Sequence, residues 1–503
     1  MNMKIALINP SLETKIYSPW PPLGILYLGT MLKENGFTVK LLDAAAKFYG
    51  KNEVINWLKY VKPDIIGISV FTVAFLPVIN LIKVIKNWNP SIKIIIGHYH
   101  PSMEAENILR KYGDYVDYCV RGEGEYSFLE LCEFLDKNKD GSPHNIKGIA
   151  FEDSKKKIIL TPETPLIMDL NDLPFPDRKL LDFDYKWNFS GFEFSKSKLT
   201  SIVSSRGCPF NCSYCACTKF AKRRFRPRSP ENIINEMLLL EGQGYTQLNF
   251  VDDNFTLQPK RTIKICQLIK KEKIDINWHT DGRVDQTSQE MLNWMRKAGC
   301  KSIWYGFESA NQRILDLYNK RTKVTQFKEA IRKTRKANID LIVGLFMLGA
   351  PTETIAEVKN TINFAINSDI DVPFFNVVEI FSGTKLWDDY ISKEIINSND
   401  NVKARVGNEI LEVERWETTT RAIDFLLSPE EREQMLFEIQ NAYQLFFSFE
   451  RKKIFLLKMI LRTIKSRFML NMAYNIMRNF RNAMDAITTF RSSKPRGFGT
   501  YDD

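Results

Sequence analysis

Short apolar runs alternate with amphipathic segments along the first third of the chain. The apolar runs are rich in β-branched residues, as in Ile94-Ile95-Ile96, which is typical of strands buried on both faces of a parallel sheet. The alternation predicts an α/β domain over residues 1–140 with a doubly wound, Rossmann-like parallel sheet. Its strands are expected at residues 5–8, 39–42, 65–70, 92–96 and 115–120.

Small and polar residues follow these predicted strands at their carboxyl ends. In a doubly wound sheet, ligands bind outside this edge, so it is expected to hold a large cofactor. The segments are Asn9-Pro10-Ser11, Asp43-Ala44, Gly97-His98-Tyr99-His100-Pro101 and Arg121-Gly122-Glu123-Gly124-Glu125.

A second series of strands and helices is predicted over residues 191–395. Its repeated alternation favours a full or partial (β/α) barrel. The segment before it, residues 141–190, is rich in polar residues and prolines and is predicted to be a linker with a small hairpin. Residues 396–491 are predicted to form a C-terminal helical region with a strong helix start at Ser428-Pro429. The tail at 492–503 is expected to be disordered.

Composition narrows the class of protein. The 503 residues are 44% hydrophobic, which is enough for several cores, and no apolar run reaches the length of a membrane-spanning helix. The N-terminus lacks the features of a signal peptide, and the eight cysteines are too few for a disulfide framework. We therefore expect a cytoplasmic protein.

The formal net charge of +11 directs attention to anionic partners. Between Glu450 and Asp485 there are nine Lys or Arg residues and no acid, interspersed with apolar side chains. Such a segment can form a basic amphipathic helix that contacts a membrane surface peripherally, or a helix packed on the barrel with its cations in water. Both alternatives stay open. No nucleic-acid-binding module is recognisable, so no nucleic-acid partner is expected.

Three cysteines, Cys208, Cys212 and Cys215, lie within eight residues of one another, just after the first predicted barrel strand. Three thiolates can hold a four-iron cluster while its fourth iron stays open for substrate or cofactor. A closed zinc site would need a fourth ligand, which Cys217 could supply. Buried structural cysteines are the remaining alternative.

The C-x-x-x-C-x-x-C run, with Tyr214 before its last cysteine, resembles the signature of radical S-adenosylmethionine (radical SAM) enzymes. The resemblance implies that the three cysteines bind a [4Fe-4S] cluster whose open iron chelates S-adenosylmethionine, and that Tyr214 lines the adenine. One-electron reduction would then give the 5'-deoxyadenosyl radical.

Further segments resemble the strands of this family's barrel. By this resemblance Asp252 and Asp253 are candidates to face the methionine amino group, and Arg283 to meet its carboxylate. Glu308 and Ser309 match the pair expected near the ribose or methionine. For Asp252, Arg283 and Glu308, a structural ion pair or a helix cap is the alternative.

The first 140 residues resemble the cobalamin-binding domain that precedes the radical domain in one branch of the superfamily. The candidate cobalamin-binding residues are Asn9, Gly97, His100, Gly122 and Glu123. The alternative is a structural scaffold without cofactor. None of the four histidines has aspartate two residues before it, which excludes a lower axial ligand from an Asp-x-His-x-x-Gly motif. His98 and His100 remain the histidines of interest.

The resemblance implies a cobalamin-dependent radical SAM enzyme that transfers a methyl group to an unactivated carbon of a small-molecule or lipid substrate. A reductant such as flavodoxin or ferredoxin would supply electrons. No side chain is assigned to the catalytic step itself. The alternatives are a radical cyclase or rearrangement enzyme without methyl transfer, and a non-catalytic metal-binding interaction protein.

Overall fold

The computed structural model describes residues 3–11, 20–137, 142–186, 188–189, 192–193, 198–406, 409–422 and 426–446. These residues form two compact units. The first gathers the described residues within 1–183, 219–222 and 381–419, and the second gathers those within 184–218, 223–380 and 420–503. The expected C-terminal amphipathic segment and tail lie outside the described residues.

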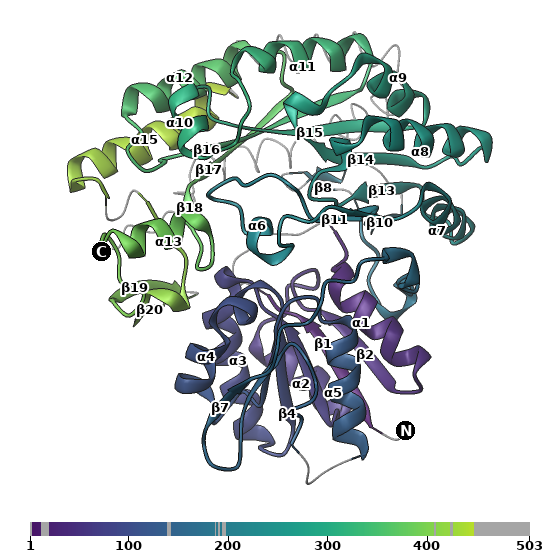
Figure 1. The fold of residues 1–503 in the computed structure, drawn as a ribbon, viewed down its shortest axis with the longest axis vertical. Coiled ribbons are helices and arrows are strands. Elements are labelled where there is room, and N and C mark those ends of the chain that lie inside the picture. Colours follow the sequence, from purple (N-terminus) through teal and green to yellow (C-terminus); the bar gives the residue numbers. More distant parts are fainter. Residues whose placement is uncertain are drawn as a thin grey trace. The chain divides into compact units, whose positions relative to one another are not determined.

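A seven-stranded sheet is the basis of the first unit, and its strand order is β2-β1-β3-β4-β5-β6-β7 (Figure 1). The first five strands are parallel, as the apolar runs predicted. The last two form an antiparallel hairpin that extends the sheet beyond β5. The strands are β1 (Lys4–Asn9), β2 (Thr38–Asp43), β3 (Ile65–Ser69), β4 (Lys93–Gly97), β5 (Tyr118–Val120), β6 (Ile149–Glu152) and β7 (Ile158–Leu160).

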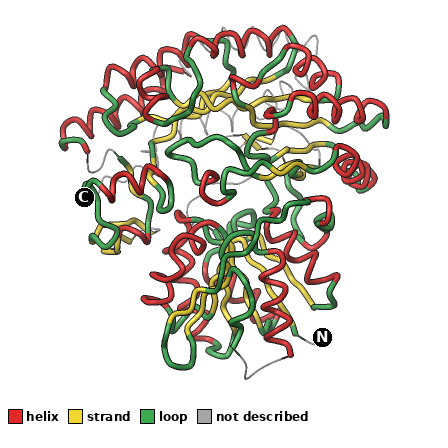
Figure 2. Tube along the Cα trace, in the orientation of Figure 1, coloured by secondary structure: helices red, strands yellow, loops and turns green. Residues whose placement is uncertain are grey.

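Helices cover both faces of this sheet, as a doubly wound fold requires (Figure 2). The apolar faces of α2, α3 and α4 join one core with Ile8, Ile66 and Ile94 of the strands. The helices α1 and α5 contact each other on the opposite face, where Phe128 of α5 approaches Gly67 of β3. The helices are α1 (Leu23–Glu34), α2 (Lys51–Val61), α3 (Phe75–Trp88), α4 (Tyr99–Tyr112) and α5 (Glu125–Lys137).

The segment 381–419 differs from the sequence prediction. Helical structure was expected from residue 396, but β19 (Asn401–Val406) and β20 (Glu409–Glu414) form an antiparallel hairpin. The prediction was wrong here because the apolar residues alternate with a period of two, which suits a strand. Ala404 and Val413 point to one side and, with Trp416, join the core of α2, α3 and α4. Before the hairpin lies α13 (Lys385–Ser392).

The second unit contains a sheet of six parallel strands in the order β10-β13-β14-β15-β16-β17 (Figure 1). The end strands β10 and β17 do not pair with each other in the described residues, so the sheet is a partial barrel. The strands are β10 (Leu199–Ile202), β13 (Gln247–Phe250), β14 (Asn277–Gly282), β15 (Cys300–Glu308), β16 (Leu341–Leu348) and β17 (Val372–Val377).

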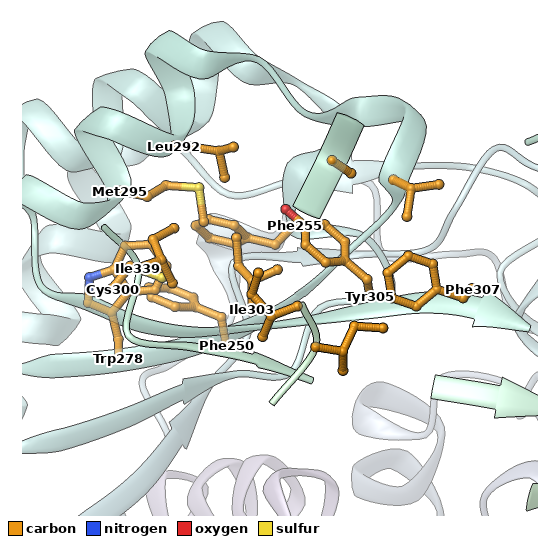
Figure 3. Close-up of a cluster of buried hydrophobic side chains, with 14 of the residues drawn as sticks. Phe250, Phe255, Trp278, Leu292, Met295, Cys300, Ile303, Tyr305, Phe307 and Ile339 are labelled. Carbon is orange, nitrogen blue, oxygen red and sulfur yellow. The ribbon is translucent and has the colours of Figure 1, made fainter. Parts of the chain in front are cut away.

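The core of this unit lies between one face of the sheet and its helices (Figure 3). Trp278 packs edge-on against Phe250, with ring centroids 5.3 Å apart, and both side chains are almost fully buried. Alternate strand residues face away from the helices, so the opposite sheet face can carry polar groups. The helices are α7 (Pro230–Gly242), α8 (Pro259–Lys271), α9 (Gln289–Lys297), α10 (Gln312–Leu317), α11 (Thr325–Lys336), α12 (Ile355–Asn367) and α15 (Pro429–Phe446).

Short elements complete the described structure. Among the described residues, no helix has the length and apolar character needed to cross a membrane. The short elements are β8 (Asn188–Phe189) paired with β9 (Phe192–Glu193), β11 (Ser205–Arg206) paired with β12 (Arg226–Pro227), β18 (Glu379–Ile380) paired with β21 (Thr420–Arg421), and α6 (Cys217–Phe220).

Candidate active site

The loop with the three clustered cysteines begins at the carboxyl end of β10, at the edge of the partial barrel. The ladder between β11 and β12 closes the loop at its base. Gly207 has a φ of +85°, a conformation that favours glycine, and this turn leads the chain directly into Cys208.

Two neighbouring aspartates from the end of β13 fasten the start of this loop. Asp252 is 3% exposed and accepts hydrogen bonds from the Ser204 N–H (2.7 Å), the Ser204 hydroxyl (2.5 Å) and the Ser205 hydroxyl (2.5 Å). Asp253 is exposed and accepts a hydrogen bond from the Gly207 N–H at 2.7 Å. Asp252 is therefore committed to the loop, whereas Asp253 keeps access to solvent.

The far end of the loop is held by the turn that follows α10. The Ser213 N–H donates to the carbonyl of Tyr318 at 2.9 Å, and the Asn319 side-chain amide donates to the carbonyl of Asn211 at 2.8 Å. These bonds fix the backbone on both sides of Cys212. The cysteine loop is thus positioned by the ends of β10 and β13 and by this turn.

The three thiols differ in environment. Cys212 is 7% exposed, whereas Cys208 and Cys215 are half-buried. Burial raises the pKa of Cys208 and of Cys212, and a hydrogen bond from the Cys217 thiol lowers the pKa of Cys215 to about 7.

Three thiols on one loop are the donors available to a metal centre at this edge. No three His, Cys, Asp or Glu side chains in the described residues converge on one metal ion, although all eight cysteines are described. A closed zinc site needs four convergent ligands. A four-iron cluster takes each cysteine on a different iron, so three thiolates suffice when its fourth iron stays open. Cys208, Cys212 and Cys215 are the side chains that would hold it.

Arg283, which follows β14, lies against this loop. Its guanidinium carbon is 3.7 Å from the ring centroid of Phe210, and its Nη1 is 3.9 Å from the sulfur of Cys212. Its other donors bind both carboxylate oxygens of Asp285 (3.0 and 3.1 Å) and the carbonyl of Lys320 (2.7 Å). Arg283 is thus occupied by the protein's own groups and brings positive charge to the thiols.

A buried ion pair lies beneath Tyr214. Glu308, at the end of β15, accepts hydrogen bonds through Oε1 from the Tyr214 hydroxyl at 3.0 Å and from the Lys320 ammonium at 2.7 Å. The side chains of Lys320 and Glu308 are only 5% and 10% exposed. Glu308 also has a left-handed backbone, with φ of +60°. The three residues link the cysteine loop to the end of β15.

Ser309 does not join this group, although it directly follows Glu308. It is fully buried, and its hydroxyl bonds to that of Thr361 at 3.2 Å and accepts from the Asn311 N–H at 3.2 Å. These contacts tie β15 to α12.

The sequence did not point to Lys320 or Asp281. Lys320 lies on an irregular turn that no motif marks, so only the fold brings it to Glu308. Asp281 lies in β14, in the same Thr280-Asp281-Gly282-Arg283 segment that singled out Arg283. Reduced hydration and repulsion from Asp252 and Asp253 raise the pKa of Asp281 to about 7, although its side chain keeps access to solvent. An acidic residue at a strand's carboxyl end was the available signal.

In the first unit, the five candidate cobalamin residues fall into two groups. Gly97 and Gly122 lie at the carboxyl edge of the sheet, and Asn9 there donates to Asp43 at 2.9 Å. Glu123 turns inward, where it accepts from the Ile167 N–H at 2.8 Å. His100 is fully buried, with its ring 4.3 Å from Phe75 and 6.2 Å from Trp416 between ring centroids.

The same edge carries features that suit a bound apolar ring system. Phe71 and Val73, just beyond β3, are 50% and 47% exposed. The hydroxyl of Thr72 between them is buried without a hydrogen-bond partner. Gly122 has a φ of +81°, and a β-carbon on it would meet no atom within 4 Å. Exposed apolar side chains beside an unsatisfied polar atom are the features that a cofactor would cover.

Comparison with known proteins shows the family to which the chain belongs. The family model of the radical SAM superfamily matches residues 202–365, and that of the B12 binding domain matches residues 12–132. An uncharacterized methyltransferase of Pyrococcus horikoshii is 33% identical over 399 residues, which are 78% of this chain and 84% of the relative. The chain belongs to the radical SAM superfamily, in the branch with a B12-binding domain.

Two other relatives of this radical SAM protein are named for different reactions, a cyclisation and a methylation. The anaerobic magnesium-protoporphyrin IX monomethyl ester cyclase of Rubrivivax gelatinosus is 30% identical over 374 residues, covering 72% of this chain and 65% of the cyclase. The hopanoid C-3 methylase of Methylococcus capsulatus is 26% identical over 352 residues, covering 68% of this chain and 64% of the methylase.

Two solved structures share the fold of this radical SAM protein. The methyltransferase TsrM from Kitasatospora setae, solved with cobalamin and a [4Fe-4S] cluster, matches with a TM-score of 0.63 and 18% identity over 78% of each chain. OxsB, solved with aqua-cobalamin and S-adenosylmethionine, matches with a TM-score of 0.64 and 18% identity over 98% of this chain and 82% of OxsB. Both support the two-domain α/β architecture.

Proposed function

We propose that this radical SAM enzyme transfers a methyl group from S-adenosylmethionine, by way of cobalamin, to an unactivated carbon of a small-molecule or lipid substrate. The observation that carries the proposal is the loop of Cys208, Cys212 and Cys215 at the barrel edge, in a chain that also has a B12-binding domain. When bound, the cluster supplies the electron that cleaves S-adenosylmethionine, and cobalamin carries the methyl group.

The residues around the loop would bind S-adenosylmethionine or stabilise the thiolates. Asp253 and Asp281 keep access to solvent, so they are better placed than Asp252 to bind the methionine ammonium. Tyr214, held by Glu308, would line the adenine. Arg283, against Cys212, would hold positive charge beside the thiolates and stabilise them without touching the substrate.

The products of S-adenosylmethionine test this proposal without knowledge of the substrate. Moving its methyl group to cobalamin releases S-adenosylhomocysteine, whereas reductive cleavage releases 5'-deoxyadenosine and methionine. The anaerobically reconstituted, cobalamin-loaded protein is first reduced, so that its cobalamin reaches the cobalt(I) state. It should then form S-adenosylhomocysteine in amounts matching its bound cobalamin, together with 5'-deoxyadenosine. Formation of 5'-deoxyadenosine alone would contradict methyl transfer.

That second outcome would support the alternative function, radical cyclisation or rearrangement. The observation in its favour is the 30% identity to a magnesium-protoporphyrin ester cyclase. The product of a cyclase would carry no label from S-adenosylmethionine with a deuterated methyl group, whereas that of a methyltransferase would be heavier by the labelled methyl.

The proposed chemistry also requires an electron donor. A low-potential donor such as flavodoxin or ferredoxin would reduce the cluster in the cytoplasm.

The basic segment between Glu450 and Asp485 would hold the enzyme at an anionic membrane surface. Co-sedimentation with vesicles tests this contact: binding to phosphatidylglycerol vesicles but not to phosphatidylcholine vesicles is expected, and equal binding to both would contradict it.

A further inference from the structure

His98 has an unusual backbone for a residue with a side chain. It follows β4 directly, and its φ of +90° with ψ of −157° lies in a region that is essentially restricted to glycine. The other non-glycine residues with positive φ in the described structure have φ values between 49° and 63°, within the ordinary left-handed region. A glycine would relieve this strain, so the imidazole is retained at a cost to stability.

The surrounding hydrogen bonds hold His98 in this conformation. Its carbonyl accepts from the Ser102 N–H (3.2 Å) and from the Ser102 hydroxyl (2.6 Å). The same hydroxyl accepts from the Gly122 N–H at 2.9 Å. On the other side, the Val70 N–H donates to the Gly97 carbonyl at 2.8 Å. The loops after β3, β4 and β5 therefore form one framework around His98.

The imidazole of His98 lies at the exposed edge of the sheet. Its ring centroid is 3.9 Å from that of the half-exposed Phe71, and neither ring nitrogen has a hydrogen-bond partner among the described residues. A neutral imidazole has a free lone pair on one ring nitrogen, and this is the form that binds metals. His100, two residues on, is fully buried and cannot reach a ligand at this edge.

We propose that His98 donates an imidazole nitrogen to the cobalt of bound cobalamin, taking the axial role that an Asp-x-His-x-x-Gly motif would otherwise supply. Phe71 and Val73 are exposed, and the hydroxyl of Thr72 between them has no hydrogen-bond partner. Bound cobalamin would cover this part of the edge. The inference rests on the cobalamin half of the proposed function. It adds the residue that sets the reactivity of the metal, because the axial ligand tunes a metal's electronics.

Electron paramagnetic resonance of the cobalamin-loaded protein, reduced to the cobalt(II) state, tests the inference. A bound nitrogen-14 splits each cobalt line into three. In protein labelled with nitrogen-15 histidine, the splitting should become twofold. It should disappear in His98→Ala and persist in His144→Ala, a matched variant of an exposed histidine in the same unit. His98→Gly should also lose the splitting while melting at a higher temperature than His98→Ala, because glycine relieves the strain.

Four results would overturn the inference. Splitting that the label does not change would identify the base of the cofactor as the ligand, and splitting that survives in His98→Ala would identify another histidine. Bound corrin without nitrogen splitting would exclude an imidazole ligand and leave the proposed function standing. Failure to bind any corrin would reject this inference together with the cobalamin half of the proposed function.

Discussion

At the scale of single residues, the structure distinguishes side chains that are free to act from those that hold the site together. Asp252 and Arg283 were expected to contact S-adenosylmethionine, but their polar atoms bind the cysteine loop and neighbouring residues. Asp253 and Asp281 remain accessible. The cysteine cluster could be read from the sequence because its three residues lie on one short loop. The ion pair of Glu308 with Lys320 could not be predicted from the sequence, because only the folded chain brings the two side chains together.

The ion pair of Glu308 and Lys320 is expected to be strongly coupled. Lys320→Met leaves the Glu308 carboxylate buried without its cation and should lower the free energy of unfolding by about 3 kcal/mol. Adding Glu308→Gln removes the unpaired charge and should recover more than half of the loss. Urea denaturation of the two single variants and the double variant measures this coupling. Additive effects would contradict a direct pair.

The buried carboxyl of Glu353 should make the free energy of unfolding depend on pH. It is 2% exposed, and burial raises its pKa from 4.5 to about 7, although it accepts from the N–H groups of Gly349 (2.8 Å) and Ala350 (2.9 Å). Between these two pH values the folded state keeps a proton that the unfolded state has lost, so stability falls as pH rises through this window.

Glu353→Gln removes this titration. The variant should be more stable than the wild type by about 3 kcal/mol above pH 7, and the gain should vanish below pH 4.5. Glu357→Gln is the matched control, because Arg313 lowers the pKa of Glu357 to about 2. The loss of stability in that control should be constant above pH 4.5 and fade only as pH falls from 4.5 towards 2. Denaturation curves between pH 4 and 8 that show a constant difference for Glu353→Gln would contradict the account.

At the scale of elements, the apolar runs located the parallel strands of both units. Burial on both faces makes these strands continuous apolar runs, which a sequence displays directly. The hairpin of β19 and β20 was missed because β20 buries only one of its faces and the hairpin lies in a charged segment. Where the hairpin packs, on α4 and the core of the first unit, depends on contacts across some three hundred residues of sequence, such as Lys111 with Glu414 (2.9 Å).

Trp416 is expected to fasten this hairpin. It is 2% exposed and packs against Phe75 and His100. Trp416→Ala should lower the stability of the first unit by about 4 kcal/mol and expose residues 381–419 to protease. Ile410→Ala, on the same hairpin but 46% exposed, should change stability by less than about 0.5 kcal/mol. Thermal unfolding and limited proteolysis measure both variants, and equal effects would show that the hairpin does not depend on Trp416.

At the scale of the whole molecule, the two units have complementary chemistry. The second presents cysteines at the edge of a partial barrel, and the first presents an apolar edge with an exposed imidazole. The order of the two folds along the chain could be predicted from the sequence, because each has its own strand and helix rhythm. The assignment of residues 381–419 to the first unit could not, because the chain returns to that unit only after the barrel is complete.

The most direct test of the account is the yield of 5'-deoxyadenosine from the anaerobically reconstituted and chemically reduced protein, measured beside its metal content. The wild type should contain about four iron atoms per chain and cleave S-adenosylmethionine. Cys212→Ala should lose both properties, whereas Cys217→Ser should keep them. Zinc in place of iron at the three cysteines, with no 5'-deoxyadenosine formed, would contradict the central claim.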